Sequence, residues 1–136
     1  MCPMSDTFLD FHDGRLTGVR LFEQSAILYL RRFDDSEHEL TLEGLESLEM
    51  SDFRQGNIVQ TVEIVTGSLP YEHAGLQRLT GSPHPAAEAK YHEAATRILE
   101  RESQRIARGE TTLVIVHSSY GADLIAICRN AICRPA

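Results

Sequence analysis

The amino-acid sequence predicts an α+β fold, in which a largely antiparallel sheet of about six to eight strands carries one long helix on one face. Three observations lead to this prediction. Short segments of alternating apolar and polar residues fill the first half of the chain, as in strands with one buried face. Residues 85–108 have the length and the period of a single helix. Two continuous apolar runs, 113–116 and 124–127, follow that helix.

Length and composition indicate one domain. The chain has 136 residues, of which 42% are apolar and 24% charged, as in an ordinary globular domain. We therefore expect a single domain over residues 1–136. Within it we expect a β-meander in 1–66, a connection in 67–84, the helix in 85–108 and a β-hairpin in 111–129.

The strand patterns of the first half follow one another closely. The Asp13-Gly14 dipeptide is typical of a hairpin turn, and Gly18 is expected at a bulge. Leu45, Leu48 and Met50 fit either a helical turn or a strand, and the neighbouring strands favour a strand. We expect strands at 7–11, 15–22, 25–32, 39–43 and 58–66.

Alternation also predicts which side chains share a face. Ala26, Leu28 and Leu30 are expected on one face of their strand, opposite Ile27 and Tyr29, and Leu40 and Leu42 are expected to share a face of the next. An inward face is expected for Ile58, Val62 and Ile64 in the last.

The predicted helix has recognisable ends and one unusual residue. Pro85 is tolerated in a first turn, and Gly109 suits a left-handed stop. Glu102 falls near the centre of the apolar stripe, so it either meets water or Arg105 at an overhanging end or is a partly buried acid with a role. The stripe consists of Ala87, Tyr91, Ala94, Ala95, Ile98, Leu99 and Ile106, and the edge beside it carries Lys90, Arg97, Arg101 and Arg108.

The two apolar runs after the helix predict strands that are covered on both faces. The long helix can cover only one face. Either the meander or a second copy of the chain must cover the other, because monomers avoid large bare apolar patches. We therefore predict self-association through the C-terminal strands or the helix. A short helix of one or two turns is also expected within residues 71–79.

Charge and cysteine content limit the class of protein. The net charge of −7 excludes a general binder of nucleic acid or of membrane surfaces, which would need a basic field, but it suits a basic protein partner. Cys2, Cys128 and Cys133 lack metal-ligand spacing, and Cys128 is expected to be a small buried hydrophobe. Without a signal-peptide pattern or a long apolar run, the chain is expected to be cytoplasmic.

Two segments of the first half carry a resemblance to a known group of proteins. They are residues 12–19 (HDGRLTGV) and residues 48–59, which contain DFRQGNIV at 52–59. Their pattern resembles small uncharacterised bacterial β-rich proteins, and similar families are grouped with immunity proteins of toxin systems. The resemblance covers at most the first 66 residues. It implies a bacterial binding protein without assigned catalysis.

Five polar residues in predicted turns and strand ends are candidate binding residues. His12 and Asp13 could form an oriented imidazole–carboxylate pair for general base work, or Asp13 could cap the turn. Asp52 and Arg54 could form a polar pair or contact a partner. His117 stands at a strand end beside Ser118, Ser119 and Tyr120, a group that turn chemistry also explains.

Metal and cofactor motifs are weak in this sequence. Glu88 and His92 lie one helical turn apart and could supply two ligands, with His84 as a third, but His92-Glu93 lacks the second histidine of a metalloprotease helix. We expect no metal and no cofactor. The predicted function is a non-catalytic protein-binding or assembly module. The alternative is a small hydrolase-like enzyme or ligand-binding domain that uses His12, Asp13 and His117.

Overall fold

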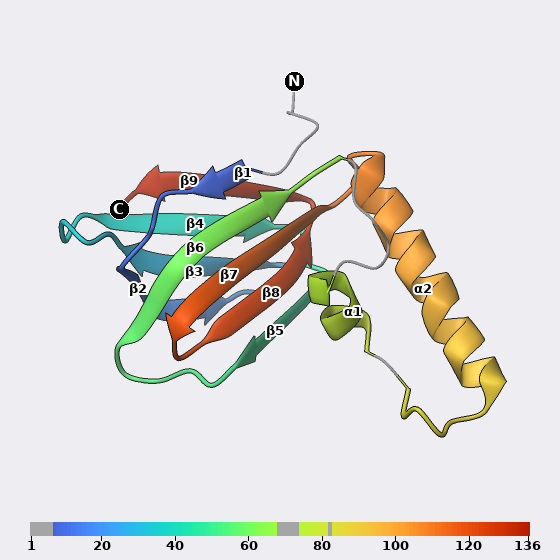
Figure 1. Cartoon of the computed structure of the whole chain (residues 1–136). Helices are drawn as coiled ribbons and strands as arrows, with labels where there is room; N and C mark the ends of the chain where they lie inside the picture. The colour runs from blue at the N-terminus through green and yellow to red at the C-terminus, as the bar shows by residue number, and fades with distance from the viewer. Residues whose placement is uncertain (1–6, 68–73, 82) are drawn as a thin grey trace.

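The computed structural model describes residues 7–67, 74–81 and 83–136, and this part of the chain forms one sheet and two helices (Figure 1). Every strand pair is antiparallel, so the predicted α+β fold with a largely antiparallel sheet is confirmed. The helices are α1 (Ala74–Thr80) and α2 (Ala89–Ala107). The strands are β1 (Thr7–Leu9), β2 (Gly14–Leu21), β3 (Ser25–Arg31), β4 (Glu37–Glu43), β5 (Ser47–Ser51), β6 (Asn57–Val65), β7 (Thr112–Tyr120), β8 (Asp123–Cys128) and β9 (Asn130–Pro135).

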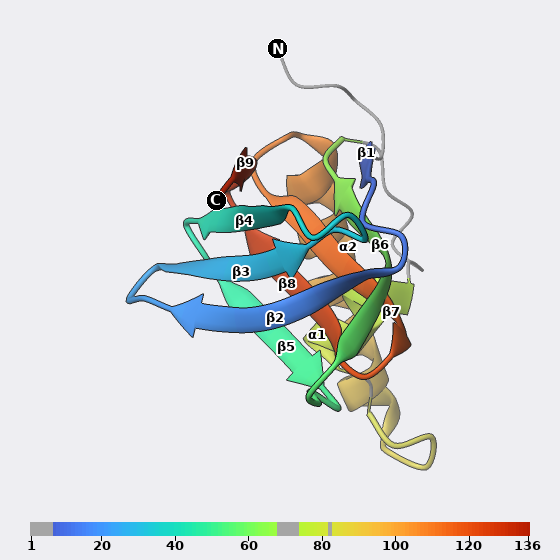
Figure 2. The same cartoon turned by 90° about the vertical axis from the view of Figure 1, so that its left-hand side faces the viewer.

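The sheet bends round until its two ends meet. Its strand order is β5-β8-β7-β6-β2-β3-β4-β9, and β1 pairs with the far half of β6. The end strands are not separate, because β4 continues into β5 after residues 44–46 and β8 continues into β9 through Arg129. These two long segments pair along both halves, β4 with β9 and β5 with β8. The layer of β2, β3 and β4 therefore faces the layer of β6, β7 and β8 (Figure 2).

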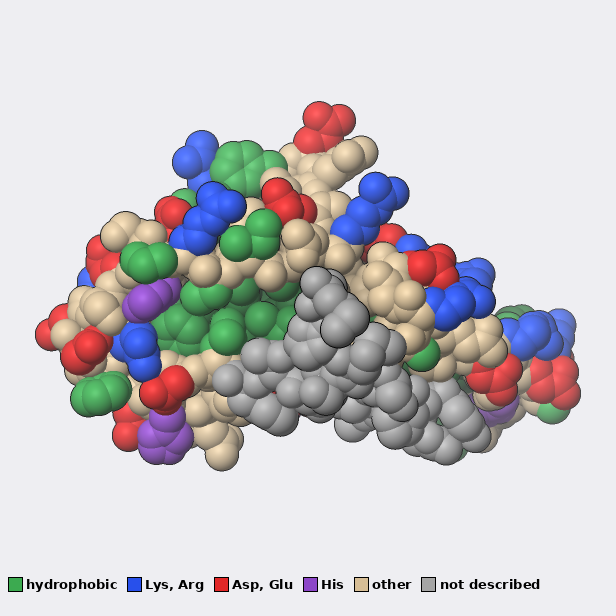
Figure 3. All heavy atoms as spheres, turned by 90° about the horizontal axis from the view of Figure 1, so that it is seen from above, with side chains coloured by type: hydrophobic (Ala, Val, Ile, Leu, Met, Phe, Trp, Pro, Cys, Tyr) green, Lys and Arg blue, Asp and Glu red, His purple; other side chains and the backbone are tan. Residues whose placement is uncertain are grey.

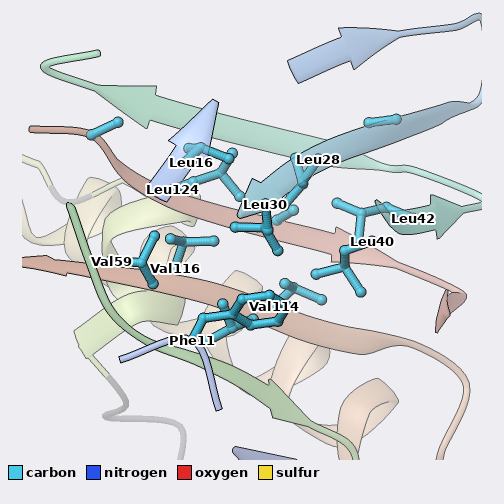
Figure 4. Packing of buried hydrophobic residues seen from close by; sticks show 14 of the residues in the cluster. Phe11, Leu16, Leu28, Leu30, Leu40, Leu42, Val59, Val114, Val116 and Leu124 are labelled. Carbon is cyan, nitrogen blue, oxygen red and sulfur yellow. The ribbon is translucent and has the colours of Figure 1, made fainter. Parts of the chain in front are cut away.

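The space between the two layers holds the main hydrophobic core. Leu28 and Leu30 of β3 point into it, as do Val114 and Val116 of β7 (Figure 4). Ala26, Leu40 and Leu42 are fully buried as well, so the faces predicted for these two strands are confirmed. Seen from above, hydrophobic side chains gather in the centre of the face, with charged and histidine side chains around them (Figure 3).

A second cluster lies outside the sheet, under the helices. Leu113 and Ile115 of β7 contribute to it from the strand side, and Leu76 of α1 and Leu99 and Ile106 of α2 from the helix side. The buried residues of α2 all lie in its C-terminal half, whereas the Tyr91 and Ile98 side chains are exposed. The helix thus packs on the sheet mainly through its last turns, and it runs alongside α1 (Figure 1).

The two C-terminal apolar runs are covered on both faces, as predicted. Consecutive residues of β7 alternate between the outer cluster and the inner core, and all of Leu113–Val116 are buried. The inner face packs against β2, β3 and β4 of the same chain. These three strands pair consecutively, but the β-meander expected over all of 1–66 is wrong, because β5 pairs with β8 and β6 pairs with β2 and β7. The bare face that motivated self-association is therefore filled from within the chain, and self-association through the C-terminal strands or the helix stays a prediction.

The helix begins later than predicted. The start at Pro85 is wrong, because Ala86 N donates to His84 Nδ1 (3.0 Å) and Ala87 N donates to the His84 carbonyl (2.8 Å) in a separate turn. Glu88 is extended, with ψ 151°, and α2 follows it. The predicted stop is confirmed: Gly109 has φ +76° and its N–H donates to the Ile106 carbonyl (3.0 Å).

Two further predictions about the strands are wrong. Asp13-Gly14 does not join a hairpin, because β1 and β2 both pair with β6. Residues 130–135, which lie beyond the hairpin expected in 111–129 and were assigned no strand, form β9 against β4. β1, β2, β3, β4 and β6 lie within two residues of their expected bounds, Leu48 and Met50 lie in β5, and the bulge at Gly18 is present. Residues 71–73 of the expected short helix lie outside the described residues, and α1 covers the remainder.

Glu102 meets Arg105, but the end of α2 lies on the sheet and does not overhang it. The Glu102 side chain is only 13% exposed, so it is a partly buried acid, and its pair with Arg105 is part of a larger link. Arg105 Nη1 lies 3.1 Å from Glu102 Oε2, and the same guanidinium binds Glu46 through both nitrogens at 2.7 and 2.6 Å. Glu46 stands where β4 passes into β5, so the link joins the end of α2 to the sheet. The hydrogen bond from Arg105 lowers the pKa of the Glu46 carboxyl.

This link predicts a pH dependence of stability. A carboxyl whose pKa is lower in the folded state contributes stability above its unfolded value, and that contribution is lost as the pH falls through the folded value. We expect urea unfolding to show a loss of stability between about pH 5 and pH 3, and the Arg105→Met variant to lose less over the same interval. Arg97→Met, which changes an exposed arginine of the same helix that has no ion pair among the described residues, is the control. Equal pH profiles for wild type and Arg105→Met would contradict the assignment.

Two further findings concern the Cys128 thiol and the helices. Cys128 is buried, as predicted, and burial raises the pKa of its thiol to about 12. No helix in the part of the chain that the structure describes is long and apolar enough to cross a membrane.

Candidate functional site

His12 and Asp13 lie in the turn between β1 and β2, with both side chains largely exposed. His12 Nδ1 is 3.2 Å from Asp13 Oδ2. Asp13 adopts a left-handed backbone with φ +61°, and its N–H donates to the Val59 carbonyl on β6 (3.1 Å). Aspartate tolerates this conformation better than most residues, so turn geometry accounts for its presence.

His117 lies on the outer face of β7 and has a different partner. Its Nε2 is 2.9 Å from Oε1 of Glu63 on β6, and only 9% of the Glu63 side chain is exposed. Glu63 was not among the candidate residues predicted from the sequence. Because side chains alternate along a strand, a glutamate between Val62 and Ile64 is expected to point away from the inner core. Glu63 is nevertheless buried, because the outer face of the sheet is covered at this position.

The structure does not bring the three alternative catalytic residues together. His12 and Asp13 lie along the edge of β6 that pairs with β2, whereas His117 belongs to β7 on the opposite edge. No described hydrogen bond or ion pair links His117 to either of them. Ser118 Oγ donates to the Gly121 carbonyl (3.1 Å) and contacts Asp123 (3.0 Å), so it serves the β7–β8 turn.

Asp52 and Arg54 form a pair in the loop between β5 and β6. Arg54 Nε donates to Asp52 Oδ1 (2.9 Å), and the guanidinium carbon lies 5.6 Å from the centre of the Tyr120 ring. Asp52 and then Tyr120 raise the pKa of Arg54, so it stays cationic. Asp52 and Arg54 side chains are 56% and 53% exposed.

Arg54 is one of three arginines that line a single hollow of about 470 Å³. Arg15 comes from β2, Arg31 from β3 and Arg54 from the loop, and we call this site the arginine hollow. Phe53, 47% exposed, adds an aromatic wall. The remaining lining residues are Leu16, Thr17, Gln55 and Gly56.

Arg15 and Arg31 are direct cross-strand partners. Like charges in this position destabilise a sheet, so the fold alone gives no reason for the pair. Arg31 Nη2 contacts Glu37 Oε1 at 3.0 Å, and the two side chains are 42% and 62% exposed. Among the described residues, no hydrogen bond or ion pair engages the Arg15 side chain.

A second hollow of about 370 Å³ shares Arg15 and Arg31 with the first and adds Arg32. Arg32 Nη2 donates to Asp10 Oδ2 (3.0 Å), while its buried Nε has no partner among the described residues. Asp13 and Asp35 also line this hollow, so its charge is mixed. The arginine hollow itself has no acidic residue in its lining.

Asn57 holds the loop of the arginine hollow in place. Its buried Oδ1 accepts hydrogen bonds from Arg54 N (2.7 Å) and from Ala122 N in the β7–β8 turn (3.0 Å). Its Nδ2 donates to the Leu16 carbonyl on β2 (3.3 Å). One side chain thus fixes the backbone before Arg54, the strand beside Arg15 and a turn distant in sequence.

No group of three or more potential metal ligands occurs among the described residues. Comparisons of the chain with protein-family models, curated proteins and solved structures find no match. The resemblance of the N-terminal half to immunity-type proteins therefore stays a prediction, and the function has to be argued from the site itself.

Proposed function

We propose that this chain is a non-catalytic binding module that docks a protein partner by taking an acidic group of that partner into the arginine hollow. The observation that carries this proposal is the convergence of Arg15, Arg31 and Arg54 from three chain segments on one hollow without acidic lining. Guanidinium groups bind carboxylates and similar anions through paired N–H donors, which makes arginine clusters suitable receptors for acidic segments.

The ion pairs already present leave the arginines available. Glu37 and Asp52 do not line the hollow and are more than half exposed. Exposed ion pairs of this kind contribute about 0–1 kcal/mol. A partner carboxylate that loses water on docking can displace them. Phe53, together with Tyr120 beside Arg54, supplies aromatic contact area of the type enriched in protein interfaces.

Binding is favoured over catalysis by the placement of the candidate acid–base groups. General acid–base chemistry needs groups within hydrogen-bond reach of one reacting centre. His12 with Asp13 and His117 with Glu63 form two pairs on different strands, and each pair is explained by its local contacts.

The experiment is a titration of two labelled peptides followed by fluorescence anisotropy. A peptide of about eight glutamates should bind, and the Arg15→Gln/Arg31→Gln double variant should bind it at least about tenfold more weakly. Arg20→Gln, which removes an exposed arginine farther along β2, should leave its affinity unchanged. Equal affinities for wild type and the double variant would contradict the proposal.

A second candidate, the immunity-like module with a basic partner, is favoured by a different surface. Glu37, Glu39 and Glu43 all lie on the outward face of β4 in a chain of net charge −7. The test peptide is about eight lysines long. Its binding should weaken in a Glu39→Gln/Glu43→Gln variant and not in the arginine double variant if this candidate is correct.

A further inference from the structure

We infer that the acidic group recognised by the arginine hollow is a doubly charged phosphate monoester on the partner rather than a carboxylate. This inference rests on the proposed function and names the ligand of the same site. A phosphate monoester carries a charge of about −1.5 to −2 near neutral pH and three acceptor oxygens. A carboxylate carries one charge and two oxygens, which a single guanidinium fork can satisfy.

The arginine hollow offers more guanidinium groups than a single carboxylate needs. Arg15 has no described partner, and Arg31 stands directly opposite it on the neighbouring strand. One anion placed between two guanidiniums relieves their repulsion, and a dianion does so about twice as strongly. Arg54 enters from the loop side, so a tetrahedral group can meet donors from β2, β3 and the loop at once.

The carboxylates that now contact the arginines are weak competitors for such a group. The Glu37 and Asp52 side chains are 62% and 56% exposed, so they can return to water when Arg31 and Arg54 turn to a ligand. The hollow of about 470 Å³ holds a phosphate together with part of the side chain that carries it. Phe53 is placed to contact that carbon skeleton.

The test compares phenyl phosphate with phenyl sulfate by isothermal titration calorimetry. Both ligands carry a ring and a tetrahedral anion, but only the phosphate changes from dianion to monoanion around pH 6. At pH 7.5 the phosphate should bind about tenfold more tightly than the sulfate, and at pH 5.5 the ratio should fall to about three. The sulfate corrects for titration of nearby protein groups, among them His12, Asp13, Asp35, Glu37 and Asp52. A ratio near one at both pH values would overturn the inference.

Variants test whether the preference for phosphate over sulfate depends on the arginine hollow. Arg15→Gln should reduce the preference for phosphate over sulfate at pH 7.5 to about twofold, because one of the two facing charges is lost. Asp52→Asn should tighten phosphate binding about threefold, because a competing carboxylate is removed and asparagine also tolerates the left-handed backbone at this position. Arg20→Gln is the matched control and should change neither quantity.

Two further ligands separate this inference from the proposed function. A short peptide with a phosphorylated tyrosine should bind at least as tightly as phenyl phosphate, as a partner protein requires. Tighter binding of adenosine monophosphate than of this peptide would keep the phosphate chemistry but contradict a protein partner. Binding of the glutamate peptide without a preference for phosphate would leave the proposed function standing and overturn this inference.

Discussion

Replacing Leu28 with alanine is expected to lower the free energy of unfolding by about 3 kcal/mol, because the substitution empties space in the centre of the core. Leu28 is fully buried between the two layers of the sheet, in the same cluster as Val114 and Leu124 on the opposite layer. The measurement is urea unfolding followed by circular dichroism. Ile27→Ala is the matched control on the same strand, where the side chain points outward and is half-buried, and it should cost about 1 kcal/mol.

The same experiment tests whether one chain is enough to cover β7 and β8. If β2, β3 and β4 cover their inner face within a single molecule, the unfolding midpoints should not change when the protein concentration rises from about 2 to 200 µM. A midpoint that rises with concentration would show that folding is coupled to association. A loss of less than about 1 kcal/mol for Leu28→Ala would contradict the position of this side chain in the core.

Local sequence patterns predicted those parts of the fold in which a residue's own type and its place in the strand or helix determine its position. Alternation placed Leu28 and Leu30 on one face correctly, because β3 has no bulge between them and Ala26, Leu28 and Leu30 are buried while Ile27 and Tyr29 are less so. The continuous run in β7 predicted burial of both faces for the same reason. Gly109 predicted the end of α2 because a left-handed backbone favours glycine.

Irregular pairing explains the faces that alternation missed. Val59 is buried in the core although Ile58 was expected there, because the pairing of β6 with β7 shifts register around Val59. The same limit applies to β9. Residues 130–135 carry no clear alternation, and their strand depends on β8 continuing past Arg129 to meet β4.

The candidate site could be predicted only in part. Arg54 was a candidate because it stands in a polar turn beside Asp52. Arg15 and Arg31 were not, because they are ordinary outward residues of two strands until the register sets them opposite each other. Long-range pairing of this kind leaves no trace in local periodicity, so the hollow becomes visible only in the folded chain.

Asn57 shows the same limit and leads to a prediction of large effect. In the sequence it is one residue of an Arg-Gln-Gly-Asn turn, yet in the structure it joins the loop of the arginine hollow to the β7–β8 turn. Gly121 in that turn has φ +89°, and an added Cβ would collide with Asn57 Oδ1. We expect Gly121→Ala to lower the free energy of unfolding by about 3 kcal/mol, from backbone strain of about 1 kcal/mol and the loss of buried hydrogen bonds of Asn57.

Gly56→Ala separates these two contributions. Gly56 also has a left-handed backbone, with φ +94°, but nothing lies within 4 Å of an added Cβ. Gly56→Ala should therefore lower the free energy of unfolding by about 1 kcal/mol, which is the cost of the backbone strain alone. Asn57→Ala, which removes the hydrogen bonds without the strain, should cost about 2–3 kcal/mol in urea unfolding. Equal losses for Gly121→Ala and Gly56→Ala would mean that the contact with Asn57 contributes nothing, and the loop would then need another anchor to hold Arg54 at the hollow.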